Sequence, residues 1–138
     1  MRLIRKATTE TVLIEDGFLW SDEFDWKPVE QNVERAIDGT LIVQEGKKKS
    51  GRPITLSPND GQGWIKRSIL STIQYWSTLQ GEQFTLVFEY PHDNRQFNVI
   101  FNHAEGAINA KPVKGFPTVS NEDDYEVTLK FLEVLDAD

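Results

Sequence analysis

The clearest structural signal in the chain is a pair of alternating apolar runs, QFTLVFEY and RQFNVIF, joined by PHDNR. In each run the apolar residues recur at every second position, as in a strand with one buried face. The short polar connection predicts an antiparallel hairpin whose two apolar faces pair in the core. The paired residues are Phe84, Leu86, Phe88 and Tyr90 in the first run, and Phe97, Val99 and Phe101 in the second.

Several other segments also have strand character. YEVTLKFLEV alternates over residues 125–131, and GAINAKPV and PITL (53–56) fit short strands. An apolar run at 12–14 precedes an Asp16-Gly17 turn signal, and the alternation of Phe24 and Trp26 suggests a half-buried strand, with acidic residues on its solvated face. The chain is therefore expected to be mainly antiparallel β.

The segment VEQNVERAIDGTLIVQEG has two possible readings. Val29, Val33 and Ile37 fit a helix at a spacing of four, and they also fit one face of a strand. Asp38-Gly39 favours the strand reading, because a two-residue type I′ hairpin turn needs a positive φ that Gly supplies readily. We predict a hairpin here.

One segment shows helical periodicity. In GWIKRSILSTIQYWSTLQG the apolar residues Ile65, Ile69, Ile73 and Trp76 recur at intervals of three and four. They predict an amphipathic helix over about residues 64–79 that begins at Trp64, is stopped by Gly81 and covers one side of a sheet.

Together these signals predict a single domain over residues 1–138, an antiparallel β-sandwich or barrel with one helix. The N-terminus and the acidic C-terminal tail are expected to be frayed. The expected core and fold residues are Trp64, Ile69, Ile73, Trp76, Phe84, Leu86, Phe88, Phe97, Val99, Phe101, Tyr125, Val127 and Leu129.

No reactive pattern stands out. The chain has no cysteine, its histidines His92 and His103 lie outside any metal-binding spacing, and no phosphate-binding loop or nucleophile motif occurs. We expect no catalytic, cofactor-binding or metal-binding residues and no enzymatic activity. The longest apolar runs are four or five residues and no signal peptide is evident, so no membrane partner is expected.

Charge gives the candidate contact residues. Fifteen Lys and Arg stand against 22 Asp and Glu, a net charge of −7 that disfavours a surface devoted to nucleic acid. A basic cluster could still meet a few phosphates, could be a solvated loop, or could meet the acidic cluster of another copy, as in a head-to-tail ring. The basic cluster is Lys47, Lys48, Lys49 and Arg52, and the acidic cluster is Asp22, Glu23 and Asp25.

The order of these patterns resembles the small tail proteins of long-tailed bacteriophages and prophages. In those proteins a G-R-P-I-T-L strand leads to a G-W helix, followed by an F-T-L … F-x-V-x-F hairpin, an I-x-A-x-P-V strand and a closing Y-x-V-T-L strand. The matching residues here are Gly51 to Leu56, Gly63-Trp64, Phe84 to Leu86, Phe97 to Phe101, Ile108 to Val113 and Tyr125 to Leu129.

The resemblance implies a virion structural protein of the distal tail or baseplate hub, made in the bacterial host cytoplasm. Such proteins form a ring, commonly a hexamer, between the tail tube and the tip proteins, so the implied partners are further copies, tube and tip. The chain is too short for the second, carbohydrate-binding-like domain that distal tail proteins often carry, so ring or adaptor building is expected over receptor binding. The alternatives are a neck or tail-completion protein, a nucleic-acid-contacting domain that uses Lys47 to Lys49, and a hydrolase without a recognisable motif.

Overall fold

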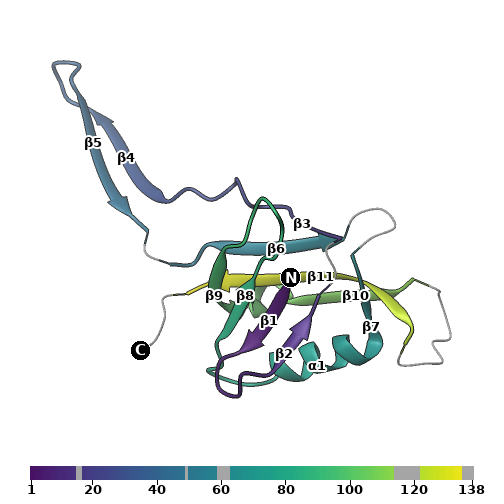
Figure 1. The fold of residues 1–138 in the computed structure, drawn as a ribbon. Coiled ribbons are helices and arrows are strands. Elements are labelled where there is room, and N and C mark those ends of the chain that lie inside the picture. The colour runs from purple at the N-terminus through teal and green to yellow at the C-terminus, as the bar shows by residue number, and fades with distance from the viewer. Residues whose placement is uncertain (15–16, 49, 59–62, 114–121, 135–138) are drawn as a thin grey trace.

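A computed structural model describes residues 1–14, 17–48, 50–58, 63–113 and 122–134 (Figure 1). Half of the structure is strand and 12% is helix, with antiparallel pairing throughout and one α-helix. The predicted fold class is confirmed, because this arrangement is consistent with a β-sandwich that carries one helix.

The strands form two sheets. The larger has nine strands in the order β2-β1-β8-β9-β11-β6-β3, with β10 and β7 also pairing with β11, and the smaller contains β4 and β5 alone. The elements are β1 (Arg2–Arg5), β2 (Thr11–Leu13), β3 (Phe18–Trp20), β4 (Val29–Arg35), β5 (Leu41–Lys47), β6 (Pro53–Pro58), β7 (Trp64–Lys66), α1 (Arg67–Ser77), β8 (Phe84–Val87), β9 (Gln96–Phe101), the 3-10 turn η1 (His103–Glu105), β10 (Ile108–Pro112) and β11 (Asp124–Glu133).

β11 is the strand around which the large sheet curls. Its first half pairs with β10 and β7, and its second half pairs with β6 and β9. Every second residue of β11 from Tyr125 to Phe131 is buried, so one strand lines the core along most of its length. The nine-stranded sheet and α1 are called the body below.

The β8–β9 hairpin supplies the facing half of the core. Phe84 lies opposite Val99 and Leu86 lies opposite Phe97, so the apolar faces of the two strands coincide. Aromatic rings form a row in the core. Trp76 of α1 packs on Phe84, with 5.5 Å between the ring centroids, and Phe84 packs on Phe101 at 5.1 Å. The buried residues also include Ile73, Phe88, Val127 and Leu129, whereas Ile69 is half-buried against the core.

The helix begins three residues later than the sequence predicts. Trp64 lies in β7, opposite Glu126, and is half-buried, while Ile65 beside it is buried in the core. Pairing with β11 therefore overrides the helical spacing at this end. Gly63 makes the entry to β7 possible, because it has a φ of 79° and a Cβ there would lie 2.6 Å from Pro58 Cα.

Two further expectations are corrected. The N-terminus is not frayed, since β1 is an inner strand between β2 and β8, and Leu3 is completely buried. Residues 21–25 form turns rather than a half-buried strand, and Phe24 is 92% exposed. The acidic tail 135–138 lies outside the described residues, as does Asp16 of the predicted Asp16-Gly17 turn.

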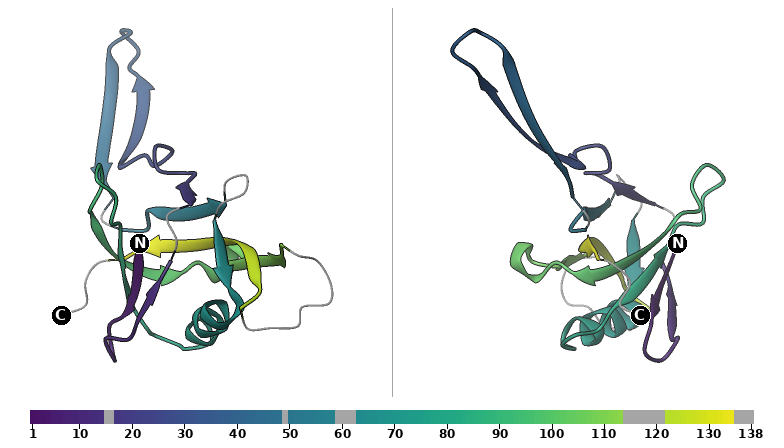
Figure 2. Two further views of the ribbon diagram at one scale, coloured as in Figure 1. Left: turned by 45° about the vertical axis from the view of Figure 1, so that its right-hand side comes forward. Right: turned by 90° about the vertical axis from the view of Figure 1, so that its left-hand side faces the viewer.

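The smaller sheet projects from the body as a single hairpin. The views of Figures 1 and 2 agree that β4 and β5 rise away from the large sheet on the side opposite α1. Residues 29–47 are called the arm. Because every residue of both strands is exposed, the arm contributes nothing to the core.

Candidate interaction surface

The predicted hairpin over 29–47 is present, but its turn differs from the expected type. Ala36 N–H donates to the Thr40 carbonyl and Gly39 N–H donates to the Ala36 carbonyl, at 2.8 and 2.9 Å. Gly39 has a φ of 90°, and Asp38 is not in the positive region that a type I′ turn requires. The loop is therefore the three-residue kind, a type I turn closed by a left-handed glycine.

One face of the arm carries four apolar side chains among four polar or charged ones. Val33 lies opposite Val43, Leu41 lies opposite Arg35, and Val29 lies opposite Lys47. Directly opposed residues share a face, so the four apolar side chains lie on the same side of the ribbon, with the hydrogen-bonded Gln31–Glu45 pair between Val29 and the other three. The four are Val29, Val33, Leu41 and Val43, each between 43% and 49% exposed.

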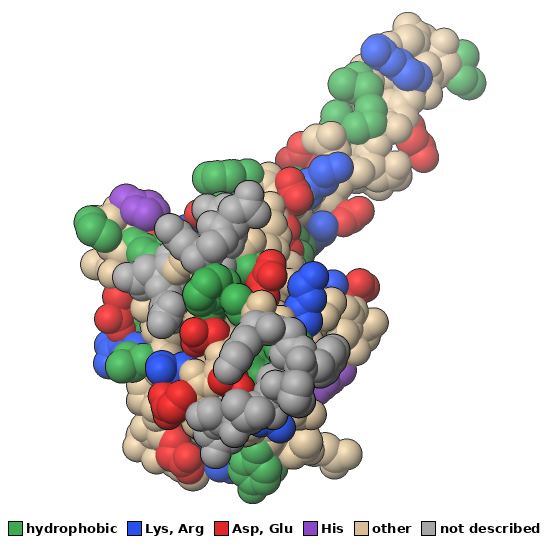
Figure 3. All heavy atoms as spheres, turned by 90° about the vertical axis from the view of Figure 1, so that its right-hand side faces the viewer, with side chains coloured by type: hydrophobic (Ala, Val, Ile, Leu, Met, Phe, Trp, Pro, Cys, Tyr) green, Lys and Arg blue, Asp and Glu red, His purple; other side chains and the backbone are tan. Residues whose placement is uncertain are grey.

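The tip and the other face complete the arm surface. Ile37 occupies the turn and is fully exposed. Ile42 lies on the second face, opposite Glu34 and next to the Asn32–Gln44 pair. Figure 3 shows hydrophobic side chains along the arm out to its tip. Exposed apolar side chains gathered on a projecting hairpin indicate an interaction site, since isolated two-stranded hairpins are only marginally stable in water.

Lys47 and Lys48 of the lysine cluster lie at the base of the arm. Lys47 ends β5 and is exposed, whereas Lys48 is half-buried, with its Nζ 3.5 Å from Glu30 and 4.6 Å above the Trp26 ring. Lys48 N–H also donates to the Pro28 carbonyl at 2.8 Å, which closes the base of the arm. Lys49 lies outside the described residues. Lys48 is thus already engaged within its own chain.

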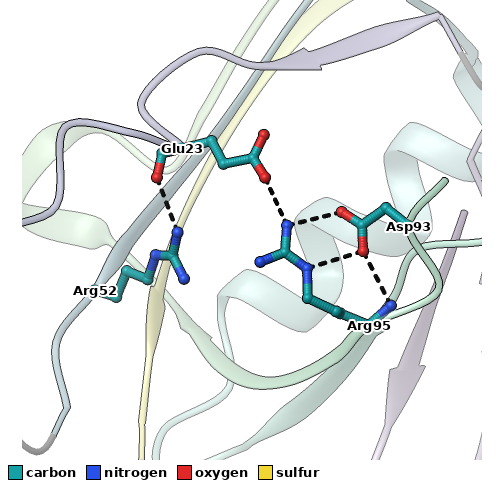
Figure 4. Close-up of polar contacts among 4 residues, drawn as sticks. All are labelled: Glu23, Arg52, Asp93 and Arg95. Carbon is teal, nitrogen blue, oxygen red and sulfur yellow. Dashed lines mark hydrogen bonds and ion pairs between the residues drawn. The ribbon is translucent and has the colours of Figure 1, made fainter.

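The acidic candidates hold the connection that leads into the arm. Asp22 accepts hydrogen bonds from Thr55 N–H and Thr55 Oγ1 at 2.9 and 2.8 Å, which fixes residues 21–25 on β6. Glu23 accepts from Arg95 Nη2 through its carboxylate and from Arg52 Nη2 through its carbonyl, at 2.5 and 2.8 Å (Figure 4). Asp25 is exposed.

Arg95, which the sequence did not single out, is the centre of this cluster. It lies in the β8–β9 connection and also binds Asp93, with an Nη2–Oδ2 distance of 2.8 Å. Its hydrogen bonds lower the pKa of the Asp93 carboxyl, and Asp93 together with Glu23 raises the pKa of the Arg95 guanidinium. Both groups therefore stay charged at neutral pH.

An aromatic ring lies beneath the two arginines. The guanidinium carbon of Arg52 is 4.6 Å from the centroid of the Trp20 ring, and that of Arg95 is 5.3 Å away. Trp20 itself stacks on Phe88 at 5.4 Å. Cation–π contacts of this kind anchor the arginines to the core. Arg52 is thus held by contacts within its own chain. It does not join Lys47 and Lys48 in a free cationic surface.

The described residues show no cluster typical of a metal site. No group of three or more His, Cys, Asp or Glu among them is placed to hold a metal ion. His92 stacks on Tyr90 at 5.5 Å, and His103 belongs to η1. No helix in the described part of the chain is long and apolar enough to cross a membrane.

No known protein matches. A scan against protein-family models, a search of curated proteins and a search of solved structures each find nothing similar to the chain.

Proposed function

We propose that the chain is a non-enzymatic structural protein of a phage tail that assembles with further copies of itself through the arm. The observation that carries the proposal is the arm, a hairpin with four apolar side chains on one face and an apolar tip that the described parts of its own chain leave uncovered. A folded protein retains such a surface when another molecule covers it in the assembled state.

The arm favours a ring over an isolated dimer. Seven residues per strand give an arm face of roughly 23 Å by 10 Å, which buries roughly 460 Å² in total when it is covered. A stable isolated interface buries at least about 1,000 Å². In a closed ring each subunit donates one arm and receives another, so the small contacts reinforce each other.

The tail assignment rests on the resemblance. Its segments fall on the body: Gly51 to Leu56 leads into β6, Gly63-Trp64 enters β7, and the last match lies in β11. We propose the distal tail or baseplate hub as the location and a hexameric ring as the form, with the tail tube on one side and tip proteins on the other. The protein would be made in the host cytoplasm and would remain in the virion.

The first test is the mass of the purified chain by sedimentation velocity over a wide concentration range. A discrete oligomer is expected, and a chain that stays monomeric at its highest soluble concentration would overturn self-assembly. The second test is gold labelling of intact phage particles with an antibody against the chain. Label at the tail end is expected, label at the head–tail junction would indicate a neck or tail-completion protein, and unlabelled particles would contradict a virion role.

Nucleic-acid binding is the less supported function. Of the lysines on which it depends, Lys48 is already occupied by Glu30 and Trp26. Replacing Lys47, Lys48 and Lys49 together with Ala tests it directly, by fluorescence anisotropy with duplex and single-stranded DNA at low salt. We expect the variant and the unmodified chain to bind DNA equally weakly. Tight binding by the unmodified chain that is lost in the variant would favour the nucleic-acid role.

A further inference from the structure

The charges of the arm alternate in sign on either side of an apolar centre. The first face, which carries the opposed pair Val33–Val43, has Glu45 two residues on the base side of that pair and Arg35 two residues on the tip side. The charged residues that follow are Lys47 at the base and Asp38 in the turn at the tip. From base to tip the signs are therefore positive, negative, positive and negative, and in the reverse direction every sign is exchanged.

This order makes the first face complementary to itself in one direction only. When two such faces are packed antiparallel about Val33 and Val43, Arg35 of one arm comes near Glu45 of the other, and Asp38 comes near Lys47. When they are packed parallel, each charge lies at the level of its own kind. Because like charges across a contact are costly and opposite charges fix the register, the pattern selects the antiparallel arrangement.

We propose that the first face of the arm packs antiparallel on the first face of a second copy's arm, across a two-fold axis at Val33 and Val43. This inference rests on the proposed self-assembly and names the surface that the arm meets. The contact is isologous, because both subunits use the same patch. When such pairs are repeated around a ring axis, each subunit donates one arm and receives one, and the small contacts reinforce each other.

The charged groups keep bonding capacity for this partner. Arg35 donates from Nη1 to the Gly39 carbonyl at 3.1 Å, which uses one of its five N–H donors. Glu45 accepts a hydrogen bond from Gln31 Nε2 at 2.8 Å, and both Arg35 and Glu45 are exposed. Exposed ion pairs add little energy each, so the apolar centre supplies the attraction and the charges set direction and register.

The tip and the base of the arm also match. Asp38 is held ionised, because hydrogen bonds from Thr40 lower the pKa of its carboxyl, and Lys47 at the base is exposed. Ile37 and Val29 lie four residues on either side of Val33, so the exposed apolar tip of one arm falls at the level of Val29 of the other. Apolar and charged groups are thus both paired at the ends of the contact.

The second face of the arm lacks this complementarity. Packed antiparallel about the Asn32–Gln44 pair, it would bring Glu34 of one arm near Glu30 of the other. Two carboxylates would then oppose each other on each side of the axis, and Glu30 already pairs with Lys48 at 3.5 Å. The first face is therefore the one that suits a second copy.

The shape of the molecule allows the antiparallel contact. The arm rises away from the body, which lies beyond its base (Figures 1 and 2). Two antiparallel arms therefore hold their bodies at opposite ends of the contact, whereas parallel arms would bring both bodies to the same end.

Charge reversal tests the contact, because each arm supplies both signs. Arg35→Glu and Glu45→Arg should each weaken self-association, measured by sedimentation at low salt, at least about tenfold, since the two-fold axis repeats each change. An equimolar mixture of the two variants should associate again, because the negative positions of one chain then face the positive positions of the other. The matched control is Glu34→Arg, the same substitution on the second face, which should leave association unchanged.

Cysteine cross-linking tests the direction of the arms, because the chain has no cysteine of its own. A tagged Ile37→Cys chain is mixed with an untagged Val29→Cys chain under mild oxidation and run on a non-reducing gel. A tagged–untagged dimer is expected. The control is Glu30→Cys, next to Val29 but on the second face, which should not be linked to the tip.

Three results would overturn the arm–arm contact. They are a mixture of Arg35→Glu and Glu45→Arg that associates as weakly as its components, equal effects of Glu34→Arg and Glu45→Arg, and linking of Ile37→Cys chains mainly to each other. If the unmodified chain assembles in such a case, the proposed function survives; if it is monomeric, both fail.

Discussion

Two of the antiparallel hairpins, β8–β9 and β4–β5, lie in opposite environments. In β8–β9 the apolar residues that face each other across the strands are at most 9% exposed, because α1 and β11 cover them. In β4–β5 the four apolar residues of one face are between 43% and 49% exposed. Alternation thus indicates that a strand has an apolar face, but it does not say whether the same chain supplies the cover.

The two hairpins also depend on different forces. β8–β9 is held by packing throughout the core, and its loss would unfold the body. The arm is held by its own ladder, by the Gln31–Glu45 hydrogen bond of 2.8 Å and by the contacts of Lys48 at its base. We infer that the body sets the stability of the protein and that the arm sets its association.

The largest effect on stability is expected in the core. Phe131→Ala removes a completely buried ring from β11 and should lower the free energy of unfolding by about 3–5 kcal/mol, measured by denaturant titration. Val33→Ala in the arm is the control and should change it by less than about 0.5 kcal/mol. A comparable cost for both variants would show that the arm belongs to the cooperative unit.

Two glycines with left-handed backbone sharpen the comparison. Gly63→Ala should cost about 1–3 kcal/mol of global stability, because it adds a steric clash with Pro58 to an unfavourable φ of 79°. Gly39→Ala has a φ of 90° but open space around it, so it should loosen the arm alone. Denaturant titration measures global stability, and hydrogen exchange measures the opening of the arm. A loss of global stability in Gly39→Ala would contradict the view that the arm is independent of the body.

The pH dependence of stability is expected to come from the body. The pKa of Asp93 is lowered in the folded state, so its stabilising contribution is complete above its ordinary value of 3.8 and is lost as the pH falls through the folded pKa. Asp93→Asn should therefore be less stable than the wild type at neutral pH, and the difference should shrink on acidification. Parallel stability curves for the two proteins down to pH 2 would be evidence against this role.

The smallest effect is expected at the base of the arm. Replacing Lys47, Lys48 and Lys49 with Glu should impair assembly while leaving the monomer folded, with a change in stability within about 0.5 kcal/mol. The effect should weaken at high salt, because Lys47 is an exposed charge. Sedimentation at two salt concentrations measures it, and assembly that survives the reversal would show that the lysines are merely solvated.

The parts of the fold that follow from sequence are those in which local pattern and tertiary packing agree. Phe97, Val99 and Phe101 alternate and are all buried, and Ile73 and Trp76 share the inner face of α1. The start of the helix was predicted wrongly, because Trp64 and Ile65 pair with β11, a partner more than 50 residues away. Local periodicity carries no information about such a partner.

The candidate surface was predictable only in part. The hairpin over 29–47 follows from Asp38-Gly39, but its separation from the core depends on how the connection at 21–25 and the residue Arg52 are fixed. Arg95 and Glu23 make one of those anchors across 72 positions of sequence. The charged residues expected to meet another subunit proved, for Asp22, Glu23, Lys48 and Arg52, to bind within the chain. Charge clustering alone does not distinguish these two uses.

Removing the arm tests the central claim most directly. Pro28 and Lys48 are joined by a 2.8 Å hydrogen bond, so residues 29–47 can be replaced by a short Gly-Ser turn without moving the body. Sedimentation velocity of this variant beside the full chain, with denaturant unfolding of both, is the decisive measurement. We predict that the variant unfolds at the midpoint of the full chain but stays monomeric where the full chain assembles. A variant that assembles as the full chain does, or that fails to fold, would contradict the claim.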